Sequence, residues 1–231
     1  MSKLVLIFCA LAFLTFSCKK DNDVSVQLLE SISISNQLFC KFEYDEQSRI
    51  TKIIYYESSG ELFFTQTLTY NSEGELILAK SESPSNSASD GQKTFVKSGN
   101  KIRISGSEIF ELNSQGLPIS QMYSDLYRSG ILTFEYLDGN MSKMTDYGRP
   151  TRITTYTYDN KKSPFYNCNS PKWVLVWGWL FWRVDLRNNK ITENMDVGVM
   201  TSYTYTYDDA GYALTSKASN GIEITYTYIK K

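Results

Sequence analysis

The chain contains no histidine among its 231 residues. Histidine is the commonest general base near neutral pH and the commonest metal ligand, so its absence argues against most acid–base and metal-dependent enzymes. A glycosidase stays compatible with the sequence, because that chemistry needs only a pair of Asp or Glu side chains. A basic surplus is also missing, since the formal net charge is −1. Nucleic-acid binding is therefore disfavoured, because nothing draws the protein to phosphate backbones.

Long apolar runs are scarce as well. The run near the N-terminus, Leu4–Phe16, covers thirteen residues and is shorter than the roughly 20 that a membrane-spanning helix needs. It has the length of a signal-peptide core, follows the basic Lys3 and ends directly before Ser17 and Cys18. This ending resembles the lipobox of Bacteroidetes lipoproteins, whose cysteine carries acyl chains such as palmitate. We predict a lipoprotein signal peptide over 1–17 and lipid attachment at Cys18; an ordinary signal peptide cleaved elsewhere is the alternative.

A charged segment, Lys19–Asp23, follows that cysteine. Such a segment lets a folded domain stand clear of the lipid headgroups, while each buried acyl CH₂ contributes about 0.8 kcal/mol to anchoring. The segment also resembles the signal that sends such lipoproteins to the outer face of the outer membrane. We predict a lipidated tether over 18–24 and a lipid-anchored location at the outer membrane, on the cell surface, with the periplasmic face as the alternative.

Cysteine is sparse, with four residues in the whole chain. Cys9 lies in the predicted signal peptide and Cys18 at the predicted lipid site, which leaves Cys40 and Cys168. Export permits a disulfide between them, but their spacing follows no pattern. Two separately buried thiols are the favoured interpretation, and a bridge is the alternative.

Tyrosine, by contrast, is abundant, with 17 residues, several of them in Thr-Tyr runs that favour pleated, half-buried strands. A hairpin unit recurs: an aromatic-x-aromatic strand end, then Asp or Asn, a short polar turn and an aliphatic strand. Asp or Asn opens such a turn by bonding its own backbone, and Gly supplies positive φ. The copies begin at Phe42, Leu68, Phe110, Phe134, Tyr156 and Tyr205.

These repeats predict an all-β fold, a single domain over 25–231 and no helix. We expect an antiparallel meander of about 14 to 17 strands, too many for a flat sheet and therefore curled into a barrel or partial barrel. The strands alternate: Tyr203, Tyr205 and Tyr207 face one way, and Thr204 and Thr206 the other. An aromatic interior and a Thr/Glu/Lys exterior argue against a barrel whose wall faces lipid.

The unit Tyr44-Asp45, followed by Ser48-Arg49-Ile50, resembles the YD (RHS-type) repeat. The chain also resembles a family of Bacteroidetes outer-membrane lipoproteins of unknown function with a porin-like antiparallel sheet. That likeness includes the stretch Tyr158–Tyr166, an aliphatic run after it and the polar turn Asn188–Thr192. The resemblance implies a fold and a location but no activity.

All four tryptophans lie in one short segment, and they are the candidate ligand-binding residues: Trp173, Trp177, Trp179 and Trp182. Exposed rings of this kind suit sugars or a partner protein. Two alternatives are a strand or plug buried in the mouth of the barrel, and insertion into a membrane interface.

No catalytic, metal or cofactor constellation is recognisable, and the carboxylates of the repeats stand singly at turns. Asp208 and Asp209 would bind Ca²⁺ only if other oxygens converged on them. We therefore predict no cofactor and a membrane-anchored, non-enzymatic module that binds a glycan or an envelope protein. A carboxylate-dependent glycosidase and a structural envelope protein without a ligand are the alternatives.

Overall fold

The computed structural model describes residues 26–84, 90–105, 108–124, 129–177 and 186–231. These residues form sixteen β-strands and one short helix, which confirms the predicted all-β class. In chain order the elements are β1 (Gln27–Ile34), β2 (Gln37–Tyr44), β3 (Ile50–Tyr56), β4 (Leu62–Tyr70), β5 (Leu76–Glu82), β6 (Gly91–Ser98), β7 (Lys101–Ile104), β8 (Glu108–Leu112), β9 (Pro118–Ser124), β10 (Ser129–Leu137), β11 (Asn140–Asp146), β12 (Arg152–Tyr158), α1 (Lys172–Val176), β13 (Lys190–Met195), β14 (Val199–Tyr207), β15 (Ala213–Ala218) and β16 (Glu223–Lys230).

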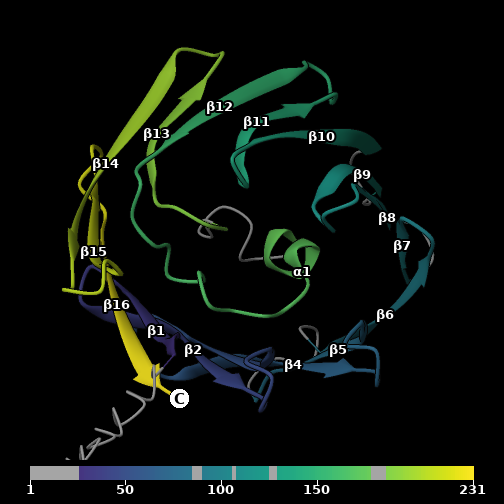
Figure 1. Ribbon diagram of the computed structural model, residues 1–231, viewed down its shortest axis with the longest axis horizontal. Coiled ribbons are helices and arrows are strands. Elements are labelled where there is room, and N and C mark those ends of the chain that lie inside the picture. Colours follow the sequence, from purple (N-terminus) through teal and green to yellow (C-terminus); the bar gives the residue numbers. More distant parts are fainter. Residues whose placement is uncertain (1–25, 85–89, 106–107, 125–128, 178–185) are drawn as a thin grey trace, which may run out of the picture.

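The strands form a closed barrel in which every strand pairs with its neighbours in the sequence (Figure 1). The ring closes where β1 pairs antiparallel with β16, from Gln27 opposite Lys230 to Ile34 opposite Ile224. Closure pairs the two strands that would otherwise be exposed edges. Of the two forms expected from the sequence, the structure is therefore the complete barrel.

The repeated turns have the chemistry expected of Asp and Asn. The Asp45 carboxylate accepts hydrogen bonds from the backbone N–H groups of Gln47 and Arg49, at 3.0 and 2.9 Å. Asn71 makes the equivalent pair of bonds one repeat later, and Gly74 closes that turn with a φ of +80°. A residue with a Cβ is strained at such a φ, which explains the glycine.

A tyrosine at the strand end before many of these turns fixes the strand to the one before it. Its hydroxyl points inward and donates to a backbone carbonyl near the start of a preceding strand, as Tyr44 does to Leu29 at 2.7 Å. The bond recurs around the barrel, from Tyr70 to Ile50, Tyr158 to Met141, Tyr205 to Lys190 and Tyr228 to Ala213. The hydroxyl of each of these tyrosines thus has a backbone hydrogen-bond acceptor in a preceding strand.

Side chains alternate between the two faces of the wall, as predicted. The outer face carries cross-strand polar pairs such as Lys143 with Glu135, at 2.8 Å, and Thr206 with Thr215, at 2.7 Å. The inner face carries apolar side chains that form one continuous core, including Ile32, Phe42, Ile53, Leu68, Leu76, Phe95, Ile102, Phe110 and Phe134. Water-facing and core-facing residues therefore follow the period of two.

The chain between β12 and β13 folds into the barrel. Its described part, residues 159–177, is called the plug below; α1 lies inside the ring in Figure 1. The plug helix is buried, with Leu175 fully enclosed, and the Trp177 N–H bonds to the Trp173 carbonyl at 2.9 Å. The expectation of no helix is wrong at this point. Inside an apolar lumen no strand is free to pair with the plug, and a helical turn satisfies backbone groups within the segment.

Polar side chains attach the plug to the turns at one end of the barrel, called the plug end. The Asn169 side-chain amide donates to the Gln47 carbonyl at 2.9 Å, and the Ser170 hydroxyl accepts from the Ile50 N–H at 2.9 Å. The plug thus completes hydrogen bonds of the first repeat, which is more than a hundred residues distant in sequence.

None of the helices formed by the described residues is long and apolar enough to cross a membrane. The predicted signal peptide, Cys18 and the tether lie outside the described residues. Signal cleavage and lipid attachment therefore stay predictions.

Candidate binding site

The barrel interior has two unlike walls. The wall facing α1 is aliphatic and aromatic, and its side chains pack against Trp173 and Trp177. The wall formed by β12 to β16 is lined instead by tyrosines, which alternate with threonines that face outward. The inward residues of that wall are Tyr156, Tyr158, Tyr203, Tyr205, Tyr207, Tyr226 and Tyr228, and most of them are only partly buried.

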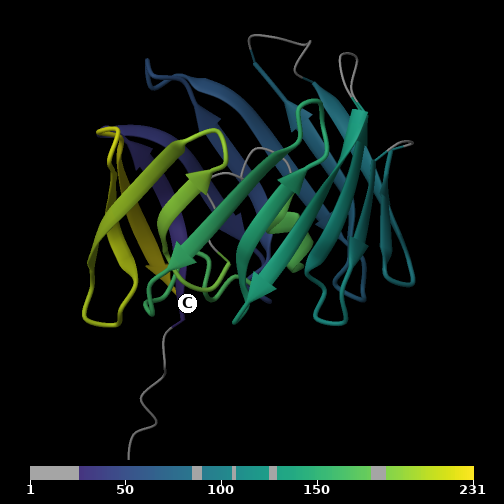
Figure 2. The ribbon, with the colours of Figure 1, turned by 90° about the horizontal axis from the view of Figure 1, so that it is seen from above.

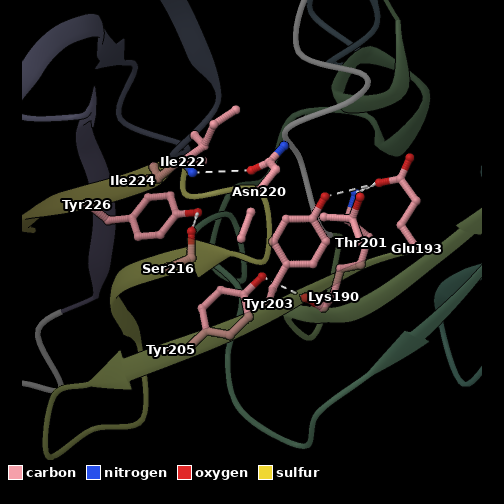
Figure 3. Close-up of a pocket in the computed structure, with 11 residues that line it drawn as sticks. Lys190, Glu193, Thr201, Tyr203, Tyr205, Ser216, Asn220, Ile222, Ile224 and Tyr226 are labelled. Atoms are coloured by element: carbon pink, nitrogen blue, oxygen red, sulfur yellow. Dashed lines mark hydrogen bonds and ion pairs between the residues drawn. The ribbon is translucent and has the colours of Figure 1, made fainter. Parts of the chain in front are cut away.

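A pocket of about 230 Å³ lies in this tyrosine-lined wall, across β13 to β16 (Figure 3). It reaches the turn between β15 and β16, which contributes Asn220 and Ile222. This turn lies at the end opposite the plug end, called the far end, because β16 runs from it towards the C-terminus (Figure 2). The pocket is lined by Lys190, Glu193, Thr201, Tyr203, Tyr205, Ser216, Ala218, Asn220, Ile222, Ile224 and Tyr226.

A charged pair stands inside the pocket. The Lys190 ammonium lies 2.7 Å from Glu193 Oε2, and the side chains are only 13% and 19% exposed. The Tyr203 hydroxyl donates to the same oxygen at 3.2 Å. The ammonium also lies 5.4 Å from the centre of the Tyr156 ring and 5.1 Å from that of Tyr203, within the range of cation–π attraction. Together these contacts fix an ion pair of zero net charge among aromatic faces.

Burial and the charge of Glu193 both act on the phenol of Tyr156. Burial, and then the nearby carboxylate of Glu193, raise the pKa of Tyr156 to about 12. Tyr156 is therefore neutral at physiological pH and presents a ring rather than a charge to the interior.

The remaining polar groups hold the pocket in shape. The Tyr205 hydroxyl donates to the Lys190 carbonyl at 2.8 Å, and Ser216 and Tyr226 share a hydrogen bond of 3.2 Å. At the far end Asn220 accepts from the Ile222 N–H through its Oδ1, at 3.2 Å. These bonds fix the aromatic rings before any ligand arrives, as in preformed ligand sites.

The described lining residues of the pocket include one carboxylate, that of Glu193, which is paired with Lys190. Glycoside hydrolysis by the usual route requires two carboxyl groups on opposite sides of the scissile bond. The described lining offers aromatic rings, this one carboxylate and several hydroxyls.

Two of the four tryptophans predicted to bind a ligand lie in the plug, in the buried environment that was the alternative interpretation of this segment. Trp173 and Trp177 are buried, at 4% and 8% exposure, and both rings contact Phe95, with centroids 5.3 and 4.9 Å apart. Trp179 and Trp182 lie outside the described residues. The assignment of the four tryptophans to ligand binding stays a prediction, but the two described rings are packed into the core.

Sequence reasoning missed Lys190 and Glu193. Their spacing of three would put them on opposite faces of a regular strand, so they suggested no pair. A register shift between Thr157 and Tyr158 of the neighbouring strand changes the pairing at Lys190 and lets its side chain lie inside with Glu193. One feature of residues 190–194 could have indicated the pair. Two opposite charges lie on a strand whose neighbouring strands, β12 and β14, carry inward tyrosines.

Other predicted polar sites prove structural. Cys40 and Cys168 are not joined by a disulfide and both are buried, as the favoured interpretation held, and burial raises the pKa of the Cys168 thiol. Asp208 accepts a hydrogen bond from the Tyr212 N–H within its turn, at 2.8 Å. Among the described residues, no group of three or more Cys, Asp or Glu side chains is placed to hold a metal ion.

Comparison with known proteins adds a likeness in fold. No protein-family model matches the chain, and the curated proteins give no match. Among solved structures, a porin-like protein from Bacteroides uniformis is 17% identical with a TM-score of 0.41, covering 89% of this chain and 96% of its own. A porin-like protein from Bacteroides vulgatus is 15% identical, also with a TM-score of 0.41, covering 88% of this chain and 99% of its own. A TcdB2-TccC3-Cdc42 complex is 12% identical with a TM-score of 0.31, and 11% of that chain is covered.

Porin-like Bacteroides proteins are thus among the solved structures to which the chain is similar. Identities and TM-scores this low transfer no activity and no location. The lipoprotein and YD-repeat parts of the resemblance stay predictions.

Proposed function

We propose that this protein is an exported lipoprotein, anchored to the outer membrane through Cys18, that binds a glycan without transforming it. The observation that carries the proposal is the tyrosine-lined pocket around Lys190 and Glu193. Aromatic faces beside hydrogen-bonding groups match the two faces of a sugar, one formed by C–H groups and the other by hydroxyls.

The position of Val26 beside Lys231 supports a defined orientation of the barrel relative to the membrane. Val26 and Lys231 exchange a pair of backbone hydrogen bonds, at 2.9 and 3.0 Å, at the plug end. The plug meets the same place, where the Asn167 amide donates to the Gln27 carbonyl at 2.9 Å. Val26 follows Cys18 by eight residues, a reach of at most about 29 Å. A lipid at Cys18 thus holds the plug end towards the membrane and leaves the far end, with the pocket, facing away.

The outer wall supports an anchored barrel rather than a lipid-embedded one. Ion pairs such as Lys143 with Glu135 and Lys217 with Glu223 stand on it. A basic side chain on a lipid-facing wall costs about 2–4 kcal/mol at the bilayer midplane. The lipid chain, and not the barrel surface, is therefore the attachment.

Fractionation of cells tests the anchor. The Cys18→Ala variant should move from the membrane fraction to the soluble exported fraction, because it loses the acyl chains that hold it. A matched Ser17→Ala variant keeps the cysteine and should stay with the membrane. Membrane retention of the Cys18→Ala variant would rule the anchor out.

A protein partner is the second candidate, favoured by the outer wall. Met122 and Ile131 are 49% and 42% exposed there, and the two residues pair directly across neighbouring strands. Contiguous exposed apolar side chains are typical of contact surfaces. A photo-crosslinker at Met122 should then form a discrete adduct in intact cells, whereas one at the polar Thr206 should not.

A further inference from the structure

We infer that the pocket across β13 to β16 is a site for a single uncharged sugar ring, with Glu193 as the acceptor of its hydroxyls. This inference rests on the proposed glycan-binding function and names its ligand class and residues. Three properties of the pocket carry it: size, charge and the direction of its polar groups.

Size limits the ligand to one ring. The pocket holds about 230 Å³, below the range of about 300 to 1,000 Å³ of sites for drug-sized ligands. Its floor is rigid, because Tyr205 is bonded to the backbone of β13 and Ser216 to Tyr226. A longer glycan would place one residue in the pocket and extend past Asn220 at the far end.

The Lys190–Glu193 ion pair disfavours charged ligands. Lys190 and Glu193 neutralise each other at 2.7 Å in a partly buried site. An anionic sugar would have to displace Glu193 from Lys190 while the carboxylate repels it, and a cationic ligand would meet the ammonium in the same way. A neutral ring meets neither obstacle.

The polar groups of the pocket are arranged to bond sugar hydroxyls. Lys190 and Tyr203 both bond Glu193 Oε2, and no described residue donates to Oε1, so that oxygen is available to a ligand O–H. Asn220 uses its Oδ1 for the Ile222 N–H, which leaves its amide NH₂ as a donor at the pocket mouth. The pocket therefore offers both an acceptor and a donor, which match sugar hydroxyls because each hydroxyl donates and accepts.

Apolar contact comes from the rest of the wall. Tyr203 and Tyr205 stand two residues apart on one face of β14, and Ile222 and Ile224 border the same space (Figure 3). Aromatic and aliphatic surface of this kind packs on the C–H face of a pyranose. Polar and apolar groups therefore converge on one small volume.

Calorimetric titration of the intact protein tests the inference, with methyl hexosides and neutral oligosaccharides as one probe series and the matching uronic acids as the other. Wild type should bind at least one neutral probe and prefer it to its uronic acid. Glu193→Gln should weaken neutral binding about tenfold, the loss expected for a charge-assisted hydrogen bond. The same variant should gain affinity for the uronic acid, because the Lys190 ammonium then has no carboxylate charge of Glu193 beside it.

Control variants separate the pocket from the fold. Thr204→Ala changes the outward residue between Tyr203 and Tyr205 and should leave binding unchanged, and Tyr203→Phe keeps the ring and should cost less than Tyr203→Ala. If wild type binds neutral sugars and the Glu193→Gln and Tyr203→Ala variants bind them equally well, the assignment of the site to this pocket is wrong, whereas the glycan-binding function stands. A wild-type preference for uronic acids would overturn the neutral assignment. No binding to any probe would overturn the pocket and the glycan function together.

Discussion

The two halves of the barrel interior differ, although one repeat builds both. In the half that faces the plug, Ile50, Phe110 and Leu175 are completely buried in a continuous apolar core. In the other half, tyrosines remain partly exposed and enclose the pair of Lys190 and Glu193. The period of two decides that a side chain faces inward. The identity of the inward side chains, together with the position of the plug, decides whether a core or a pocket results.

Hydroxyls explain why the plug helix α1 packs on the apolar half. A buried tyrosine hydroxyl is costly without a hydrogen bond, and Tyr158 and Tyr228 obtain theirs from strand carbonyls. A plug laid over the tyrosine wall would also cover the Lys190–Glu193 pair and remove water without replacing its hydrogen bonds, which is costly. Apolar plug residues such as Trp173 gain more from the aliphatic wall.

Alkaline pH should destabilise both halves, and this is the largest effect expected. Burial raises the pKa of Tyr55 and Tyr70 well above the usual 10.0. Burial, with Glu193, also raises that of Tyr156 to about 12. Above pH 10 or so the unfolded chain releases phenolic protons that the folded protein keeps, so the free energy of unfolding falls by up to about 1.4 kcal/mol per pH unit for each such tyrosine.

Below pH 10 or so these phenols are protonated in both states and should contribute no pH dependence. Urea unfolding followed by circular dichroism at a series of pH values measures the slope. A free energy of unfolding that stays constant as the pH rises through about 10, where exposed tyrosines ionise, would contradict the prediction. Tyr70→Phe removes one of these phenols, so the free energy of unfolding of this variant should fall less steeply with pH above pH 10 or so.

Truncation of one aromatic side chain in each half sharpens the contrast. Trp173→Ala removes a ring that is 4% exposed and packed against Phe95, and should cost about 3–5 kcal/mol of unfolding free energy. Tyr203→Ala removes a partly exposed ring and its bond to Glu193, and should cost about 1 kcal/mol. Denaturant unfolding of both variants measures the difference. Equal losses would show that the halves do not differ in packing.

A smaller effect than the loss of the Trp173 ring is expected at the attachment of the plug. Ser170→Ala leaves the Ile50 N–H without its buried acceptor and should cost about 1–3 kcal/mol. Ser163→Ala is the matched control on the same plug, because Ser163 is fully buried and its hydroxyl has no hydrogen-bond partner among the described residues. That variant should be neutral or slightly stabilising. Hydrogen exchange at the Ile50 amide should quicken in the first variant alone.

Local patterns allowed much of the wall to be predicted. The alternation of Tyr203, Thr204 and Tyr205 predicted a strand with one inward face, and Asp45 predicted the turn that it forms. The number of repeats predicted roughly the number of strands. Each of these features depends on interactions within a few residues of the chain, which a single sequence displays directly.

Long-range packing was beyond the reach of those patterns. The pairing of Gln27 with Lys230 closes the barrel across nearly the whole chain. The burial of Trp173 depends on Phe95 and Phe110, which belong to distant strands. The tryptophan cluster was therefore ambiguous between a platform and a plug, because rings of the same composition serve either role.

Chain-local chemistry accounts for the strands, their tight turns and the two faces of the wall, since neighbouring residues alone set backbone conformation and side-chain alternation. Closure of the ring, the plug and the meeting of Lys190 with Glu193 depend on which distant surfaces come together, and on a single register shift beside Tyr158. These are outcomes of packing in three dimensions, where burial and unsatisfied polar groups compete over the whole molecule.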